Sequence, residues 1–345
     1  MRYLTTLLAL LFCTLAQAAG PQTPKSAAPL KWQDENGVWH YGDSRPASDG
    51  SAANAGVTAL ERGDYAIAFR EFYRWAQQGD PAAQSQVARL YLEGQGVAQS
   101  DKLAVQWFQK AAEKGNVDAQ ASLGTLLAQG RGAPRNDKEA VKWLQKAAAQ
   151  GHAEGQYQLA QLVAAGRGLP RSEESAARWL AAAAAQGHRQ AQLELALRYA
   201  DGRGVARDEA QASHWYRKAA EQGQVDAQNN LAVRYADGRG VERNDAEALR
   251  WFRAAAEQGL AQAQHSLGTM LESGRGTPRD EAQAALWYRK AAEQGLVLAQ
   301  YALGQLLAAG RGVARDPEAA ARWLQQAAAQ GHAEAQTALA LLYLG

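Results

Sequence analysis

The sequence is built on a repeat of 36 residues, and this period constrains the fold more than any other feature. Glycine recurs at that spacing from Gly79 to Gly331, and a glutamine follows each of these glycines by five residues. A tryptophan keeps the same spacing from Trp107 to Trp323. A regular period of this length, in a range of about 20 to 50 residues, predicts one solenoid rather than several separate domains.

Each period predicts two helices that are joined by a glycine-rich turn. In residues 118–129, apolar and small residues recur at helical spacing, and Gly130 follows where a glycine favours the end of a helix. The second helix carries the tryptophan and several alanines on one face, so neighbouring helices can approach closely. It is predicted to begin after a side chain that can cap a helix N-terminus. The predicted capping residues are Ser100, Asn136, Ser172, Asp208, Asn244, Asp280 and Asp316.

This pattern resembles the Sel1-like repeat, a relative of the tetratricopeptide repeat, over residues 53–345. The matching elements are A-Q-x-x-L-G-x-x-L/Y-x-x-G-R-G, then D/E-x-x-x-x-x-W-Y/F, then A-A-x-x-G. The resemblance implies an all-α fold, a right-handed superhelical α/α solenoid of helix pairs. We expect an N-terminal cap at 53–78, seven periods from about 79 to 330, and a C-terminal helix at 331–345.

The first residues are typical of a secretory signal peptide. Arg2, an apolar run and the small-residue triplet Ala16-Gln17-Ala18 predict cleavage after residue 18. The only cysteine, Cys13, lies within this segment, so the mature chain has no thiol or disulfide. No later apolar stretch reaches the length of about 20 residues that a membrane span needs. We therefore expect a bacterial periplasmic or secreted protein without a transmembrane anchor.

Residues 19–30 have the composition of a linker, and residues 31–52 predict a short β-hairpin that turns at Asn36-Gly37. We expect its aromatic side chains to pack on the first solenoid helices or on one another, with stacking on a sugar or a partner as the alternative. The hairpin resembles a small domain of unknown function from exported bacterial proteins, of the DUF4124 type. The matching residues are Trp32, Asp34, Gly37, Tyr41 and Asp43.

The sequence offers little catalytic chemistry. His152, His188 and His332 share one repeat position, too far apart for a common metal, and we expect them to be solvated loop residues. Motifs of hydrolases, zinc peptidases and nucleotide-binding loops are lacking. The formal net charge of +2 at pH 7 is far from that of a nucleic-acid binder. We expect no enzyme, cofactor, metal site or nucleic-acid partner.

The Gly-Arg-Gly sequence of each period looks like a phosphate-binding loop, but a helix precedes it where that motif requires a strand. Each of its arginines is followed four residues later by another. The two series could pair with acidic residues and carbonyls at helix ends, or they could form an edge that attracts an anionic partner. The twelve residues are Arg131, Arg135, Arg167, Arg171, Arg203, Arg207, Arg239, Arg243, Arg275, Arg279, Arg311 and Arg315.

By analogy with tetratricopeptide repeats, the variable positions of the first helices are expected to face the concave side. Tyr157, Leu193 and Leu197 would give this groove an apolar centre with polar flanks, which suits a protein or peptide. The alternative is that these residues face water or close against neighbours. The predicted groove residues are Arg89, Tyr157, Gln161, Leu193, Leu197, Asn229, Val233, His265, Tyr301 and Gln305.

The hypothesis that follows is an exported, non-catalytic repeat scaffold that mediates protein–protein interaction through its concave surface, in cell-envelope assembly or signalling. One alternative is the peptidoglycan or β-lactam hydrolysis associated with some cysteine-rich Sel1-like proteins. Another is glycan binding through the aromatic hairpin and the arginine edge. The final helix has no second helix to cover it, so it is expected either to cap the solenoid or to support self-association.

Overall fold

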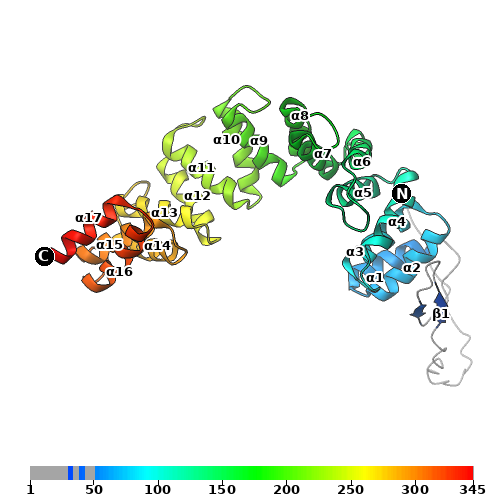
Figure 1. Ribbon diagram of the computed structural model, residues 1–345, viewed down its shortest axis with the longest axis horizontal. Helices are drawn as coiled ribbons and strands as arrows, with labels where there is room; N and C mark the ends of the chain where they lie inside the picture. The colour runs from blue at the N-terminus through cyan, green and yellow to red at the C-terminus, as the bar shows by residue number, and fades with distance from the viewer. Residues whose placement is uncertain (1–29, 34–38, 43–50, 345) are drawn as a thin grey trace, which may run out of the picture.

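The chain is described here by a computed structural model over residues 30–33, 39–42 and 51–344. Two strands, β1 (Leu30–Gln33) and β2 (Trp39–Gly42), are followed by seventeen helices in this described part. Figure 1 shows the helices following one another in chain order along an elongated, curved molecule. The helices are α1 (Ser51–Arg62), α2 (Tyr65–Gln77), α3 (Pro81–Glu93), α4 (Asp101–Glu113), α5 (Val117–Gln129), α6 (Asp137–Ala149), α7 (Ala153–Ala165), α8 (Glu173–Ala185), α9 (Arg189–Asp201), α10 (Glu209–Glu221), α11 (Val225–Asp237), α12 (Asp245–Glu257), α13 (Ala261–Ser273), α14 (Glu281–Glu293), α15 (Val297–Ala309), α16 (Pro317–Ala329) and α17 (Ala333–Leu344).

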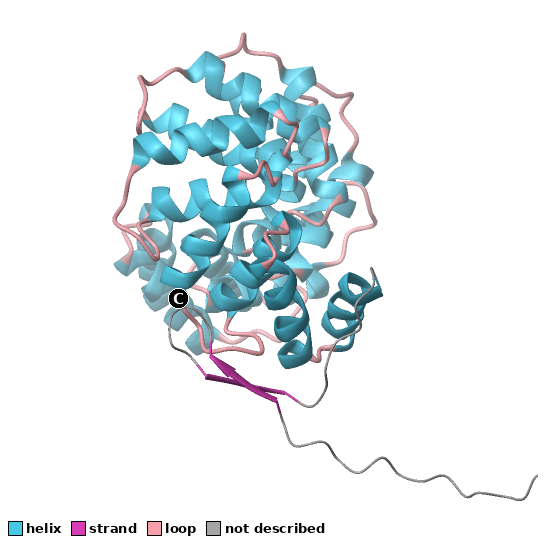
Figure 2. Ribbon diagram, turned by 90° about the vertical axis from the view of Figure 1, so that its right-hand side faces the viewer, coloured by secondary structure: helices cyan, strands magenta, loops and turns pink. Residues whose placement is uncertain are grey.

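The arrangement confirms the predicted α/α solenoid. Each helix packs mainly on the helices before and after it in the chain. Figure 2 views the molecule from its right-hand side in Figure 1 and shows the helices joined by loops around its edge. The first helices of successive repeats also touch, α5 against α7 and α15 against α17. This proximity places the first helices, the odd-numbered ones from α3 onward, on the inner side of the superhelix.

Capping side chains start the second helices as predicted. All seven predicted residues, from Ser100 to Asp316, accept a hydrogen bond from a backbone amide in the first turn of the helix that follows. Each such cap typically contributes about 1 kcal/mol. The regular start of these helices therefore has a local cause in every repeat.

The two glycines of each Gly-Arg-Gly turn have separate structural roles. Gly238 ends α11 in the left-handed conformation, with φ of 72°. Gly240 also has a positive φ, of 67°, and a Cβ at this position would lie 1.9 Å from the carbonyl oxygen of Glu209 in the preceding repeat. The second glycine thus lets the turn pass directly over the start of an earlier helix. The motif is a joint between repeats.

The residue after each tryptophan is the main side chain of the core. That residue is buried in all seven periods, whereas among the seven repeat tryptophans only Trp107 and Trp251 are buried. In the second period Leu144 packs against Gly124, where a Cβ would come within 2.6 Å of the leucine Cγ. The Leu-Gly pair of the first helix therefore forms the surface on which the core residue of the following helix packs. The seven core residues are Phe108, Leu144, Leu180, Tyr216, Phe252, Tyr288 and Leu324.

A glutamine ladder joins each repeat to the next. The glutamine five residues after each inter-repeat glycine is buried from Gln84 to Gln300, and its Nε2 donates to an alanine carbonyl eight residues earlier. From Gln120 onward its Oε1 accepts from a second glutamine in the following repeat. The donors are Gln150, Gln186, Gln222, Gln258, Gln294 and Gln330, at 2.8 to 2.9 Å.

At the N-terminal end, β1 and β2 pair antiparallel with Trp32 opposite His40, and β2 lies against α2. The predicted turn at Asn36-Gly37 and the predicted signal peptide at 1–18 lie outside the described residues. The predicted linker at 19–30 does so too except for Leu30, which is the first residue of β1. At the other end, α17 leaves Leu341 and Tyr343 largely exposed, at 65% and 71%. Over the described ranges, no helix is long and apolar enough to span a bilayer.

Candidate binding groove

Two predicted groove residues converge on a third that the sequence analysis missed. The Tyr157 hydroxyl on α7 donates to Glu194 Oε1 on α9 at 2.9 Å, and Gln161 Nε2 donates to Glu194 Oε2 at 2.5 Å. The Tyr157 ring stacks on His188 with 4.6 Å between centroids. Burial and the Glu194 carboxylate together raise the pKa of the Tyr157 phenol well above its usual range. The groove therefore has a defined polar cluster at α7 and α9.

The apolar centre predicted for the groove is smaller than expected. Leu193 is only 5% exposed and belongs to the core, because α9 turns this side chain toward the second helices. It offers almost no surface to a partner, which corrects its placement among the groove contacts. Leu197, one turn later, is half-buried and packs at the edge of the same core.

The C-terminal part of the groove combines aromatic and amide groups. Tyr301 lies against His332 at 4.7 Å between centroids, and Gln305 Nε2 donates to the Tyr301 hydroxyl at 2.5 Å. His265 packs on Tyr288 at 5.4 Å, and burial lowers the pKa of this histidine below its ordinary value. Between these groups, Asn229 and Val233 are half-buried. The Asn229 Oδ1 atom is buried and accepts no hydrogen bond from the described residues.

A cavity of about 400 Å³ opens between α3, α5 and α7. Its lining includes two predicted residues, Arg89 and Arg131, together with the carboxylates of Asp118 and Glu154 and the hydroxyl of Thr125. The lining of this cavity therefore carries both positively and negatively charged side chains. Such a lining suits a polar segment that carries both donors and acceptors better than a uniformly charged ligand.

The three equivalent histidines are helix caps, which corrects the expectation of solvated loop residues. His188 Nδ1 accepts from the backbone amide three residues later at 3.1 Å, and its Nε2 lies 2.9 Å from Glu154. His152 makes the same cap, with Nε2 3.1 Å from Asp118, and His332 caps α17. A ring that accepts at Nδ1 carries its proton at Nε2, facing the carboxylate. Over the described residues, no group of side chains is arranged to hold a metal ion.

Replacing His188 by alanine should lower the free energy of unfolding by about 1 kcal/mol, because the first turn of α9 loses its cap. His188→Asn should keep most of this stability, since Asn116 caps α5 in the same way, accepting from the amide of Ala119 at 2.8 Å. Both variants lose the stack on Tyr157, so the difference between them isolates the cap. Urea unfolding followed by circular dichroism measures it, and equal losses would contradict a capping role.

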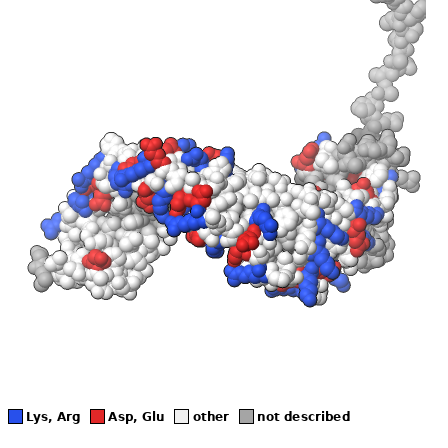
Figure 3. Space-filling view, turned by 90° about the horizontal axis from the view of Figure 1, so that it is seen from above, with Lys and Arg blue, Asp and Glu red and all other residues white. Residues whose placement is uncertain are grey.

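The predicted arginine edge is largely paired within the protein. Eleven of the twelve arginines lie within 4 Å of a carboxylate, and Arg315 donates to the carbonyl of Ala308. Hydrogen bonds from Arg275 and Arg243 lower the pKa of Asp245 to about 2. These carboxylates cancel much of the field of the edge. On the face drawn in Figure 3, basic and acidic side chains lie intermixed. Its attraction for an anionic partner stays a prediction.

Two buried arginines break the regular pairing, and the sequence analysis missed them. Arg198 and Arg234 occupy a helix position where other repeats have leucine or methionine, and they are 6% and 5% exposed. Arg234 Nη1 bonds Glu209 Oε2 at 2.7 Å, and its guanidinium lies 5.0 Å from the Tyr216 ring centroid. Arg239 of the turn is displaced and pairs with the exposed Asp237. The signal was the repeated R-Y-A-D-G-R-G sequence in these two periods.

The fold and the groove together define an α/α repeat protein whose inner face carries variable side chains on a constant core. The Sel1 repeat model matches seven consecutive segments, and the chain belongs to the Sel1 repeat family. Matching residues are 81–116, 117–152, 153–188, 189–224, 225–260, 261–296 and 297–332. A comparison with curated proteins gave no match.

Two solved structures are similar over most of the chain. One is a protective antigen of uropathogenic Escherichia coli strains, 36% identical with a TM-score of 0.80 over 85% of this chain. This chain covers 64% of that protein, just under two thirds of its length. The other is a Sel1 repeat protein from Oxalobacter formigenes, 35% identical with a TM-score of 0.60 over 85% of this chain and 86% of that one. Proteins of this family generally act as scaffolds for protein interaction, and the repeat fold is typically non-catalytic.

Proposed function

We propose that this protein is an exported, non-catalytic scaffold that binds another protein of the cell envelope along its inner groove. The amino-terminal sequence supports export, since an apolar run and a small-residue triplet follow Arg2. Membership of the Sel1 repeat family supports a scaffold role. The finer assignment, to envelope assembly or signalling, rests on the predicted export.

The observation that carries the proposal is the polar cluster of Tyr157, Gln161 and Glu194. Glu194 is the only acidic residue at its repeat position, yet both of its oxygens are already occupied by side chains of the neighbouring helix. This arrangement holds the aromatic ring and the amide in fixed positions on the inner face. Rigid aromatic side chains with a polar tip are typical anchors of protein interfaces, because little side-chain entropy is lost on binding.

Photocrosslinking in living cells tests the proposal. A photoreactive amino acid at Gln161 or Gln305, both in the groove, should give the same adduct, and this adduct should be recovered with the envelope fraction. The same group at Arg178 or Gln325, exposed on the second helices α8 and α16, should not give it. Tyr157→Ala combined with Leu197→Asp should weaken the adduct at least tenfold while the helix content stays native.

Two results would contradict the proposal. Equal adducts from the inner and outer positions would mean that the groove is not the preferred contact surface. An adduct that persists in the Tyr157→Ala/Leu197→Asp variant would show that the cluster contributes nothing to the partner's affinity. Leu193 is left unchanged in this design, because a charge at a side chain that is 5% exposed would test folding instead.

A further inference from the structure

The first joint of the glutamine ladder differs from the six that follow it. Gln84 is 4% exposed, and its Nε2 donates to the carbonyl of Ala76 at 3.1 Å. Its Oε1 is buried and accepts no hydrogen bond from the described residues. At each later joint a glutamine of the next repeat supplies that bond, as Gln150 does to Gln120 at 2.8 Å. Gln84 is therefore a buried acceptor without its donor.

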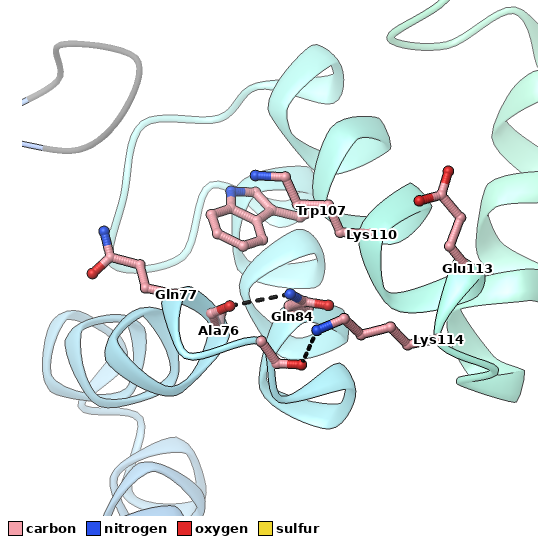
Figure 4. A pocket seen from close by; sticks show the side chains of 8 residues that line it. Ala76, Gln77, Gln84, Trp107, Lys110, Glu113 and Lys114 are labelled. Atoms are coloured by element: carbon pink, nitrogen blue, oxygen red, sulfur yellow. Dashed lines mark hydrogen bonds between the residues drawn. The ribbon is translucent and has the colours of Figure 1, made fainter.

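The cause is a single change of residue. Lys114 stands where the later repeats have the donating glutamine, and its Nζ donates to the carbonyl of Gly79 at 2.6 Å, as Figure 4 shows. At a later joint Gln222 Nε2 makes the equivalent bond to Gly187 at 3.0 Å and also reaches Gln192 Oε1 at 2.8 Å. Lys114 performs only the first of these two functions. Its side chain is exposed.

A cavity of about 550 Å³ lies at this joint, and Gln84 is one of its lining residues. The others include Trp107, Lys110, Glu113 and Lys114, shown together in Figure 4. The volume far exceeds the share of about 30 Å³ that one water molecule occupies in the liquid. The joint therefore combines room for a larger group with a buried acceptor that a donor would satisfy.

The surrounding charges restrict what that group can be. The lining carries two lysine ammonium groups, of Lys110 and Lys114, against the single carboxylate of Glu113, so its net charge disfavours a further cation beside Gln84. A carboxylate could meet the lysines, but it has no proton for Gln84 Oε1. A primary carboxamide supplies both a donor and an acceptor. Its NH2 group donates to Gln84 Oε1, and its oxygen accepts from a lysine ammonium. The six later joints already hold this group in the equivalent place.

We propose that the cavity at the first joint binds a primary carboxamide, the side chain of a glutamine or asparagine on a partner chain. The bound carboxamide occupies the position that a glutamine side chain occupies at each of the six later joints, where glutamine stands in place of Lys114. The site lies among α2, α3 and α4 and shares no residue with the cluster at Tyr157, so the two surfaces are separately testable.

Titration of the full-length mature protein with two small probes tests this site. N-acetylglutamine methylamide should give saturable shifts of the Trp107 indole and Gln84 side-chain signals in NMR spectra. N-acetylglutamate methylamide should give shifts at least tenfold weaker at the same concentration. Lys114→Gln should abolish the response and raise the melting temperature, because its own carboxamide then fills the site.

Gln150→Lys is the matched variant, since it makes the same change at the second joint. It should create a second response there, reported by the Gln120 side-chain signal. Shifts of equal size with both probes would overturn the proposal. So would a native response to the glutamine probe that survives in Lys114→Gln, or no saturable response in the native protein, which would mean that water alone occupies the cavity.

Discussion

Replacing Gly240 by alanine should lower the free energy of unfolding by more than about 3 kcal/mol. The added Cβ would lie 1.9 Å from the carbonyl oxygen of Glu209 and 2.7 Å from the next backbone nitrogen, neither of which can rotate away. The positive φ of 67° adds a further penalty for any residue with a side chain. Urea unfolding followed by circular dichroism gives the loss directly.

Gly223→Ala is the matched control for this prediction. Gly223 also has a positive φ, of 79°, but a Cβ there would meet no atom within 4 Å. This variant should lose about 1 to 2 kcal/mol of the free energy of unfolding, which is the cost of the left-handed conformation alone. Because repeats contact only their neighbours, the Gly240 variant should also broaden the transition, as the two halves unfold separately. Equal losses in the two variants would mean that close approach is not the reason for the second glycine.

Much of the fold could be predicted because its causes are local and recur in every period. The caps at Ser100 and Asn136 and the end of the first helix at Gly130 need only neighbouring residues to act. The contact of Gly240 with Glu209 could not be predicted in the same way. It joins residues about thirty positions apart, and the distance depends on how one repeat is placed on the next.

The groove was harder to predict than the fold for a physical reason. Which side chain of a first helix faces the inner side depends on the rotation between repeats, and a small rotation buries Leu193 while it leaves Leu197 half-exposed. Glu194 lay one residue away from a predicted position, and its unusual charge at that repeat position was the available signal. The capping role of the three histidines was not predicted, because histidine is not among the residues that are preferred at helix N-caps.

The second large effect should appear at the ion pair between the buried Arg234 and the half-buried Glu209. Glu209→Gln should lower the free energy of unfolding by about 3 kcal/mol, because it leaves a 5% exposed guanidinium without its anion. Asp245→Asn is the matched control, since its partners Arg243 and Arg275 are 62% and 40% exposed and neither is left as a buried charge, and it should cost about 1 kcal/mol. Denaturant unfolding at neutral pH compares the two variants, and equal losses would contradict an effect of burial.

Arg234→Leu should recover most of the stability that Glu209→Gln removes. Leucine fits this helix position in other repeats, and a buried pair replaced by apolar groups is often neutral or stabilising. The double variant should therefore lie within about 1 kcal/mol of the native protein, which gives a coupling energy of about 2 to 3 kcal/mol. Additive losses would mean that Glu209 acts through Arg207 alone, its other partner at 2.5 Å.

The pH dependence of the free energy of unfolding tests the contribution of the Glu209 carboxylate itself. Hydrogen bonds from Arg207 and then Arg234 lower the pKa of Glu209 below its usual value. A carboxyl whose pKa is lower in the folded state stabilises it above the unfolded pKa of about 4.3, and the contribution disappears as the pH falls through the folded pKa. The native protein should lose stability over this acid range more steeply than the double variant, in which residue 209 no longer titrates. Parallel pH profiles would show that the carboxylate of Glu209 is no more stabilised in the folded chain than in the unfolded one.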